Sequence, residues 1–365
     1  MRFSVYKLAL LGNFVQMRRW PRLWPLLAVM AAIAGTVYVQ HVCKAWYRAI
    51  YEPGCIATSN REDRKSIYGQ YSWRDIFQFS DKENEKFTKG LTNITTIMTP
   101  TDCTRADSDQ GIDVLIYINS AIENRKRRDF IRKTWGANIN VIELVIKVVF
   151  VLGTLPSYND YDVDTKREHE VHGDILQGDF IDNYMNLTYK GVLGLTYAAN
   201  CSTARYILKV DDDVLVNIFR LKYHIDTYAP ALTDKLQCFL YGGYDADVSR
   251  KPKAKWCMNR DEFLDTYYPD FCGGSAVLMT LTTAEKLITE TWTTPFYWVD
   301  DVYVFGLLAY KANIGHVHMS VNFDGNVTYY QSLYNNSSSL IFANIQDDAI
   351  REQVWQWILL DVDRV

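Results

Sequence analysis

The sequence predicts an α/β fold with a doubly wound, Rossmann-like sheet and a mixed second half, preceded by one transmembrane helix. From Gly111 onward, short apolar runs alternate with polar segments of helical length, and such alternation is typical of parallel sheets covered by helices. Residues 23–39 form an apolar run near the short end of the lengths that cross a bilayer. The 365 residues are 48% hydrophobic and 22% charged, which suits a globular protein with a buried core.

The N-terminal region predicts a signal anchor. No acidic residue precedes Glu52, and more basic residues lie before the apolar run than just after it. The positive-inside rule therefore places the N-terminus in the cytosol and the rest of the chain in the lumen. The alternative is a cleaved signal peptide, because Ala34-Gly35-Thr36 resembles a cleavage site. We favour the anchor because the basic leader is long for a signal peptide; the expected parts are a tail at 1–22, an anchor at 23–39, a stem at 40–108 and a lumenal domain at 109–365.

Cysteines, sequons and charge describe the environment of the lumenal part. The seven cysteines include no CxxC pair, which disfavours a structural zinc site and fits a few scattered disulfides. A net charge of −4 disfavours nucleic acid as a partner. Several Asn-X-Ser/Thr sequons follow the anchor and favour a secretory route: Asn93, Asn186, Asn200, Asn326, Asn335 and Asn336.

The alternating segments predict the order of the sheet elements. Short apolar runs indicate buried strands at 112–118, 144–152, 174–180 and 206–210. Between them, segments 121–135, 160–172 and 184–201 are compatible with helices. The second half is more mixed, with expected strands at 239–242 and 273–280 and expected helices at 283–291 and 302–311. Ligands of such sheets bind beyond the carboxyl ends of the strands.

An acidic triplet stands at one of these carboxyl ends. Asp211, Asp212 and Asp213 directly follow the strand at 206–210. Alternate side chains of an extended segment share a face, so Asp211 and Asp213 should project together while Asp212 points away. Two such carboxylates can hold a hard divalent cation, with water and substrate phosphates completing its shell. A helix N-cap is the alternative, but a cap needs one Asp and does not explain the preceding buried strand.

Several segments in the same order resemble glycosyltransferase family 31, the β-1,3-galactosyl- and β-1,3-N-acetylglucosaminyltransferase group. They are RDFIRKTWG at 128–136, FVLG at 150–153, EHEVHGDILQGDFIDNYMNLTYK at 168–190, KVDDDVLVN at 209–217, YPDFCGG at 268–274 and VDDVYV at 299–304. The resemblance implies a GT-A fold, a UDP-sugar donor, Mn²⁺ or Mg²⁺, inversion at the anomeric carbon, and a type II protein of the Golgi membrane. It also implies a glycan acceptor on a glycoprotein or glycolipid, and a homodimer is a further expectation.

The resemblance also assigns roles to the acidic residues. Asp301 is the expected catalytic base, with Asp300 beside it where the family usually has Glu. The alternative is that both belong to the N-terminus of the next helix. Asp213 is the expected principal metal ligand, while Asp211 also lies toward the ribose and Asp212 belongs to the cofactor-binding set. His318 is the expected third metal ligand; His316 and His318 as an ordinary surface pair remain the alternative.

Other matched positions have two readings each. Arg128 and Arg132 contact the nucleotide or pair with a carboxylate. Gly273 and Gly274 permit a close approach of the backbone to a sugar, or serve packing. Asn186 falls in a matched block, so it is as much a structural asparagine as a sequon. The expected disulfides are Cys201–Cys272 and Cys238–Cys257. Galactose is the favoured donor sugar; N-acetylglucosamine, glucuronic acid, N-acetylgalactosamine and a non-catalytic chaperone or glycan-binding relative remain alternatives.

Overall fold

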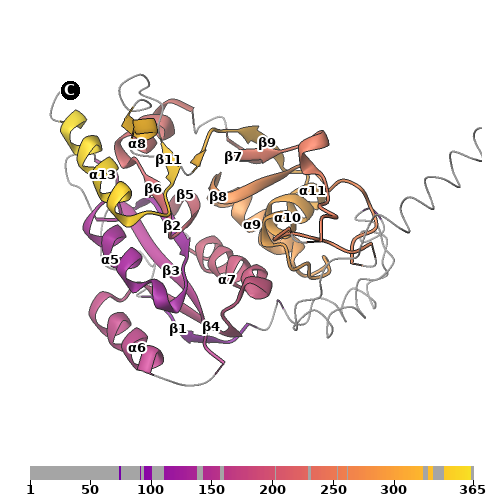
Figure 1. The fold of residues 1–365 in the computed structure, drawn as a ribbon, viewed down its shortest axis with the longest axis horizontal. Helices are drawn as coiled ribbons and strands as arrows, with labels where there is room; N and C mark the ends of the chain where they lie inside the picture. The colour runs from indigo at the N-terminus through magenta and orange to yellow at the C-terminus, as the bar shows by residue number, and fades with distance from the viewer. Residues whose placement is uncertain are drawn as a thin grey trace, which may run out of the picture. The chain divides into compact units, whose positions relative to one another are not determined.

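The computed structural model describes residues 74, 91, 94–100, 111–137, 143–156, 160–201, 203–228, 232–252, 254–260, 262–323, 328–331 and 341–362 (Figure 1). The expected tail and anchor at 1–39 lie outside these residues. No helix within the described ranges is both long and apolar enough to cross a membrane. The chain divides into two compact units, and residues 250–257 group with the N-terminal part. The larger unit, Thr58–Ser249 with Met258–Val365, carries the fold and the site.

Four parallel strands form the first half of the main sheet. They are β2 (Ile112–Asn119), β3 (Ile146–Thr154), β4 (Ile175–Ile181) and β5 (Ala204–Asp211). Their spatial order is β4-β3-β2-β5, and all three neighbouring pairs are parallel. The chain therefore moves outward from β2 to β4 and returns to the other side of β2. The point where the order reverses, between β2 and β5, is where doubly wound sheets bind ligands.

The second half of the sheet is mixed, as expected. After β5, β8 (Phe271–Thr280) runs antiparallel, β7 (Lys235–Tyr241) antiparallel to β8, and β9 (Gly315–His318) parallel to β7. At the opposite edge, β1 (Thr96–Met98) pairs antiparallel with β4. Strand β1 lies before the expected domain boundary at 109. A segment that the sequence analysis assigned to the stem therefore forms an edge strand of the sheet.

Helices cover both faces of this sheet (Figure 1). The longer ones are α5 (Arg125–Lys133), α6 (Asp160–His172), α7 (Leu187–Ala199), α8 (Ile218–Tyr228), α9 (Leu281–Glu290) and α13 (Asp348–Val362). A composite helix follows residue 299: α10 (Asp300–Val302), a π-helical turn (Tyr303–Leu307) and α11 (Leu308–Lys311). Single 3₁₀ turns are Ile122–Asn124, Tyr184–Asn186 and Gly243–Ala246. The amide of Asn186 donates to the carbonyl of Ile181 at 2.8 Å, which supports its structural reading.

The alternation of β2 and β5 residues separates two cores. Leu115 and Ile207 pack into one core together with residues of α7, α9 and the composite helix. Ile116 and Leu208 face the other way, into a core shared with α8 and α13. Because successive side chains of a strand point to opposite faces, continuous apolar runs are required at these positions. This is why the parallel strands were recognisable in the sequence.

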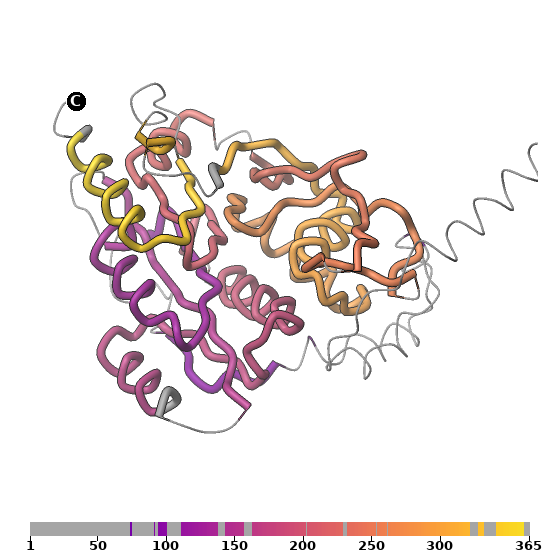
Figure 2. The backbone as a smooth tube through the Cα atoms, viewed as in Figure 1, coloured from indigo at the N-terminus to yellow at the C-terminus, as the bar shows by residue number. Residues whose placement is uncertain are grey.

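A small second sheet joins the C-terminal region to the end of β5. It contains β6 (Val214–Val216), β11 (Phe342–Asn344) and β10 (Asn322–Phe323). Strand β11 pairs antiparallel with β6, which directly follows the acidic triplet. As a result the C-terminal segment, yellow in Figure 2, runs next to elements from the first half of the sheet.

The expected disulfide pairs are wrong. Cys238 of β7 bonds to Cys272 of β8, with their Cα atoms 5.5 Å apart. Neither Cys201–Cys272 nor Cys238–Cys257 can then form, although Cys201 and Cys257 are each disulfide-bonded. The reason is topological: β7 and β8 are neighbouring antiparallel strands, and an irregularity in their register between Cys238 and Leu240 accompanies the close approach of the two cysteines. Sequence spacing carries no information on that pairing.

Candidate active site

Asp212 is a structural residue of the triplet. Strand β5 ends at Asp211 and β6 begins at Val214, so Asp212 lies in the turn between them. Its carboxylate is buried and accepts hydrogen bonds from Ser120 Oγ at 2.7 Å, Asn124 Nδ2 at 2.8 Å and Arg127 Nη1 at 2.9 Å. These contacts tie the triplet to the loop that follows β2. Arg127 Nη1 also lies 3.9 Å from Asp213 Oδ2, so the carboxylates of Asp212 and Asp213 share this arginine.

Asp213 is held by residues from the C-terminal segment. Its carboxylate accepts hydrogen bonds from Asn344 Nδ2 at 3.1 Å and from Gln346 Nε2. Its carbonyl oxygen accepts the backbone N–H of Ile345 at 2.9 Å. Sequence reasoning missed these amides because more than a hundred residues separate them from the triplet and no motif marks them. They orient Asp213 while 19% of its side chain stays accessible.

Lys209 is a buried residue of the site that contacts both β5 and β8. It lies two residues before Asp211 on the same face of β5, and only 2% of its side chain is exposed. Its ammonium donates to Asp211 Oδ1 at 2.7 Å and to the carbonyl of Gly274 on β8. Burial raises the pKa of Asp211 to about 6, with Lys209 opposing the rise and the nearby Asp213 and Asp301 adding to it. The charges of Asp213 and Asp301 thus both act on Asp211.

Asp300 and Asp301 begin the composite helix beside this lysine. A methyl group added at Gly274 would overlap Asp301 Oδ1 and lie 2.9 Å from Lys209 Nζ. The carboxylate of Asp301 thus occupies the space that a side chain at Gly274 would take. Burial raises the pKa of Asp300; Lys209 opposes this and Asp211 reinforces it. The carboxylates of Asp211, Asp300 and Asp301 consequently lie around one buried ammonium group.

The need for a glycine at 274 leads to a first prediction. Gly274→Ala should lower kcat roughly 100-fold, because the added methyl displaces the Asp301 carboxylate and a shift of about 1 Å can cost that much. Steady-state kinetics of the transferase activity that the sequence resemblance implies, followed as UDP release, measure the effect. Gly315→Ala is the matched control, since its added methyl makes only ordinary contacts at 3.9 Å. Equal kcat values for the two variants would show that Gly274 does not shape the site.

Tyr117 and Asn119 complete the cluster from β2. In the sheet register Tyr117 lies opposite Lys209 and Asn119 opposite Asp211. Within the part of the chain that the structure describes, the Tyr117 hydroxyl and both polar atoms of the Asn119 amide are buried without a hydrogen-bond partner. Burial raises the pKa of Tyr117, and Asp300, Asp211 and Asp301 raise it further. A signal for both residues was available: they are polar at alternate positions near the end of a strand beside the switch point.

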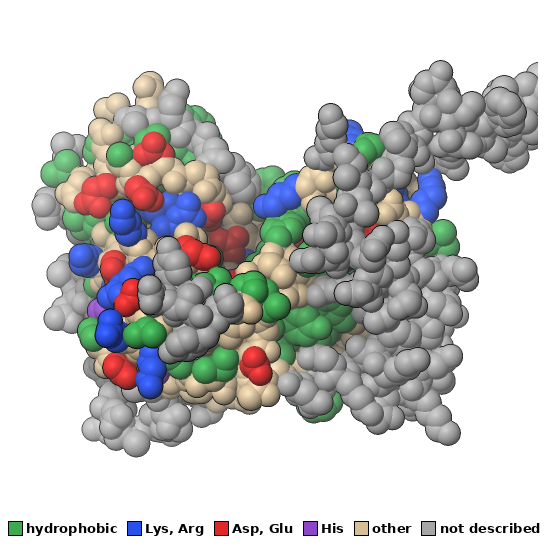
Figure 3. Space-filling view, turned by 60° about the horizontal axis from the view of Figure 1, so that its bottom comes forward, with side chains coloured by type: hydrophobic (Ala, Val, Ile, Leu, Met, Phe, Trp, Pro, Cys, Tyr) green, Lys and Arg blue, Asp and Glu red, His purple; other side chains and the backbone are tan. Residues whose placement is uncertain are grey.

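Arg128 and Arg132 pair with carboxylates, which is the second of their two readings. Arg128 is fully buried, and its Nε and Nη2 each lie 2.8 Å from an oxygen of Glu168. Arg132 makes a similar two-point contact with Asp174 at 2.8 Å and also bonds Glu168. Acidic and basic side chains are intermixed on the left of the face shown in Figure 3. This network fixes α5 against α6 and β4 rather than leaving cations open to a nucleotide.

Glu168→Gln should destabilise the fold by about 3–5 kcal/mol, because it leaves the buried Arg128 without its counter-charge. Although burial of Glu168 raises its pKa, the two arginines outweigh this and hold the pKa below 4.5. A carboxyl with a lowered pKa in the folded state contributes stability above its unfolded pKa and loses it as pH falls through the folded value. Wild type should therefore lose stability below about pH 4.5 more steeply than the variant, as measured by urea unfolding between pH 3 and 7. The exposed Glu170 provides the control variant, Glu170→Gln.

His318 lies apart from the aspartates within the sheet. It ends β9, and two strands, β8 and β7, separate β9 from β5. Its Nδ1 faces the N–H of Leu240 at 3.4 Å, and its ring packs edge-on against Phe239. Among the described residues, no three His, Cys, Asp or Glu side chains form a group that could hold a metal ion. The expected ligand set Asp211, Asp213 and His318 is therefore not assembled. His316 hydrogen-bonds the carbonyl of Phe305 at 2.7 Å instead.

Asp211 and Asp213 are the residues of this site that could hold a divalent cation. The negative charges of Asp213 and Asp301 raise the pKa of Asp211. Lys209 contacts Asp211 at 2.7 Å, and Arg127 lies 3.9 Å from Asp213. Hard cations prefer such oxygen ligands and commonly complete their shells with substrate phosphates. Gly273, by contrast, serves packing, because a methyl there would lie 2.9 Å from the ring of Tyr241.

Comparison with known proteins places this site in a family. Residues 126–320 match the family model described as galactosyltransferase. The chain belongs to this galactosyltransferase family. The resemblance to family 31 is confirmed, and the matched range contains the acidic triplet, Gly274 and Asp301. Tyr117, Asn119 and the amides that hold Asp213 lie outside the matched range.

Three curated relatives show the range within the galactosyltransferase family. The chain is 32% identical to mouse beta-1,3-galactosyltransferase 1 over 55% of its own length and 61% of the relative. It is 28% identical to zebrafish lactosylceramide 1,3-N-acetyl-beta-D-glucosaminyltransferase A, covering 62% of each protein. It is 29% identical to Drosophila beta-1,3-galactosyltransferase brn over 63% of its length and 69% of the relative. The chain thus spans about three fifths of the first of these relatives.

Proposed function

We propose that this chain is a metal-dependent, inverting glycosyltransferase that moves a hexose from a UDP-sugar to a hydroxyl group of a glycan, forming a β-1,3 linkage. One observation carries the proposal. Asp211 and Asp213 lie at the end of β5, at the switch point of the sheet, and Lys209 joins Asp211 to the backbone of Gly274, beside which the Asp301 carboxylate lies. Ligand-binding and proton-accepting carboxylates are thereby adjacent, as a reaction between a diphosphate sugar and a hydroxyl requires.

The residues of the cluster divide the chemistry between them. Asp213 and Asp211 would hold Mn²⁺ or Mg²⁺, which when bound offsets the negative charge that develops on the departing diphosphate. Asp301 accepts the proton of the acceptor hydroxyl while that oxygen bonds to the anomeric carbon and the bond to the diphosphate breaks. One such displacement inverts the anomeric centre. Lys209 keeps the carboxylates in place, and Asp300 is the second candidate for the base.

For the donor we favour galactose, with N-acetylglucosamine as the alternative. The matching family model is described as galactosyltransferase, and the mouse and Drosophila relatives are named for that sugar. The zebrafish relative is named for N-acetylglucosamine transfer, and the residues of the site do not select between the two sugars. The acceptor we propose is a glycan carried by a glycoprotein or glycolipid.

We place the protein in the Golgi membrane with its catalytic domain in the lumen. Cys201, Cys238, Cys257 and Cys272 all take part in disulfides, which persist in oxidising compartments such as the secretory pathway. The anchor at 23–39, which the sequence predicts, would hold the protein there.

A UDP-release assay tests the function. The full-length chain, purified in a mild detergent, is incubated with Mn²⁺, each of several UDP-sugars and a panel of defined glycans. We expect UDP release that depends on both the acceptor and the metal, with loss of activity in EDTA and recovery when Mn²⁺ is restored. A folded protein that neither binds UDP nor releases it with any pair would instead support a non-catalytic role.

A further inference from the structure

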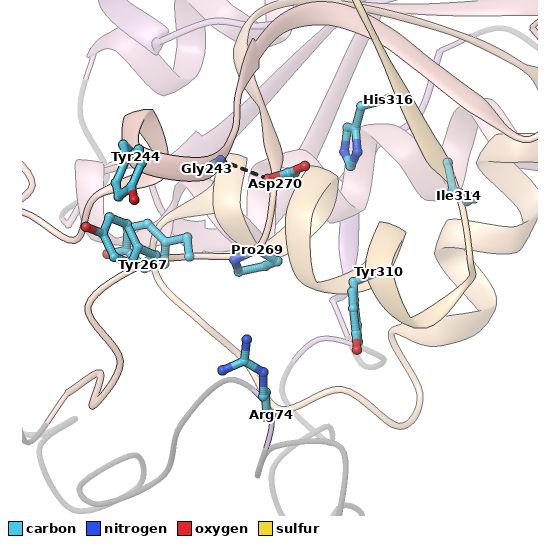
Figure 4. Close-up of a pocket in the computed structure, with 10 residues that line it drawn as sticks. Arg74, Gly243, Tyr244, Tyr267, Pro269, Asp270, Tyr310, Ile314 and His316 are labelled. Carbon is cyan, nitrogen blue, oxygen red and sulfur yellow. Dashed lines mark hydrogen bonds between the residues drawn. The ribbon is translucent and has the colours of Figure 1, made fainter.

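A second binding feature lies beside the composite helix. It is a cavity of about 520 Å³ whose lining includes Tyr244, Tyr267, Asp270, Tyr310 and His316 (Figure 4). None of these residues belongs to the carboxylate cluster. We propose that this cavity binds a neutral oligosaccharide, namely the part of the acceptor glycan that lies away from the reacting hydroxyl group. The inference rests on the proposed transferase function and names its acceptor as an extended glycan rather than a single sugar.

Exposed aromatic rings are the first reason. Tyr244 is 86% exposed, Tyr310 55% and Tyr267 39%, although large rings are normally covered. The rings of Tyr244 and Tyr267 meet edge to face with their centres 5.8 Å apart, which holds them at the rim of the cavity. Pyranose rings present apolar C–H faces that stack on such aromatic surfaces. Grouped exposed rings around a concave site therefore favour a sugar ligand.

A fixed carboxylate is the second reason. Asp270 Oδ1 accepts the backbone N–H of Gly243 at 3.2 Å. The turn is shaped around it: a methyl at Gly242 would lie 3.1 Å from the same oxygen, and Gly243 has a φ of 56° that favours glycine. In the described part of the chain, Oδ2 has no hydrogen-bond partner and can accept hydroxyl hydrogens in charge-assisted bonds. The cavity is also lined by Arg74, so its wall carries one carboxylate and one guanidinium group, which can accept from and donate to the hydroxyl groups of a neutral glycan.

Continuity with the reaction site is the third reason. Asp270 directly precedes β8, and Gly274 of this strand contacts Asp301. The composite helix packs closely on the start of β8, because a methyl at Gly306 would lie 2.9 Å from Phe271 Cβ. Tyr310 follows Asp301 by nine residues on the same composite helix, which corresponds to about 14 Å at 1.5 Å per residue. A ligand that reaches from the cavity to Asp301 must therefore consist of several sugars.

The proposal predicts an effect that depends on acceptor length. In Tyr310→Ala and Tyr244→Ala, the KM for an acceptor of three N-acetyllactosamine repeats should rise roughly three- to tenfold, the effect of losing one stacked ring. The KM for a monosaccharide benzyl glycoside, the donor KM and kcat should stay unchanged. Tyr223→Ala is the matched control, because Tyr223 is similarly exposed, at 59%, on the distant α8. Equal changes for all acceptor lengths, no change, or a change only with glycoprotein acceptors would overturn the proposal.

A binding experiment without donor tests the cavity independently of the transferase function. Saturation-transfer NMR with the three-repeat oligosaccharide, without donor, should show contacts in wild type and in Tyr223→Ala. The contacts should be lost in a Tyr244→Ala, Tyr310→Ala double variant. If no UDP-sugar supports transfer, the proposed function fails, but the binding experiment still shows whether the cavity binds the oligosaccharide. If transfer occurs but the oligosaccharide binds wild type and the double variant equally, or binds neither, the cavity is not a glycan site.

Discussion

Asp301→Asn is expected to lower kcat by about 10²- to 10⁴-fold, the range that a positioned general base contributes. Asparagine keeps the size of the side chain beside Gly274 but cannot accept the hydroxyl proton. Donor binding should persist, because Asp211 and Asp213 are unchanged. Initial rates of UDP release measure kcat, and calorimetric titration with UDP and Mn²⁺ measures donor binding.

Asp300→Asn supplies the comparison for this experiment. Asp300 begins the same helix, and Lys209 opposes the rise that burial causes in its pKa. However, the carboxylate that fills the space at Gly274 belongs to Asp301. Its variant should retain a much larger share of kcat than Asp301→Asn. The reverse ranking, with near-normal rates for Asp301→Asn, would transfer the role of base to Asp300.

Asp213→Ala is expected to reduce activity below detection, because it removes a carboxylate that we assign to the cation and the diphosphate. Manganese-dependent UDP binding should be lost with it, unlike in Asp301→Asn. The fold should remain, since Asn344 and Gln346 are partly accessible and can bond water once the carboxylate is gone. Calorimetric titration and thermal unfolding measure the two properties separately.

A matched control for Asp213→Ala is Asp212→Asn, which changes the neighbouring carboxylate. Asp212 is buried among Ser120, Asn124 and Arg127, so its variant should lower stability while keeping measurable manganese-dependent UDP binding. Retained manganese-dependent UDP binding in Asp213→Ala would contradict the ligand assignment.

Much of the fold was predictable because strands that are buried on both faces need apolar residues at consecutive positions, and such runs are visible in the sequence. The apolar runs that became β2, β3, β4 and β5 appear in the sequence since both faces of these strands are covered. The expected helix at 160–172 matches α6. Elements with weaker periodicity were missed. Strand β1 has three residues at the sheet edge, and the short β6 and β11 depend on pairing with distant partners.

The candidate site shows the same division. The acidic triplet and Asp301 were found because motifs mark them, and the structure brings them together. Lys209 and Gly274 were present in matched motifs, but no pattern showed that one ammonium joins them or that Asp301 fills the space at Gly274. Arg128 stood as an open choice between nucleotide and carboxylate until Glu168 was found against it.

The sequence alone determined the class of fold, the strand that carries the triplet, and the membership of a glycosyltransferase family. These properties depend on residue type at short spacing, through side-chain periodicity and backbone conformation. Only the tertiary structure decided that Cys238 bonds Cys272, that Asn344 orients Asp213 and that Lys209 reaches Gly274. The physical reason is that such contacts join residues far apart in the chain, and their pairing follows from how the whole sheet and its helices pack.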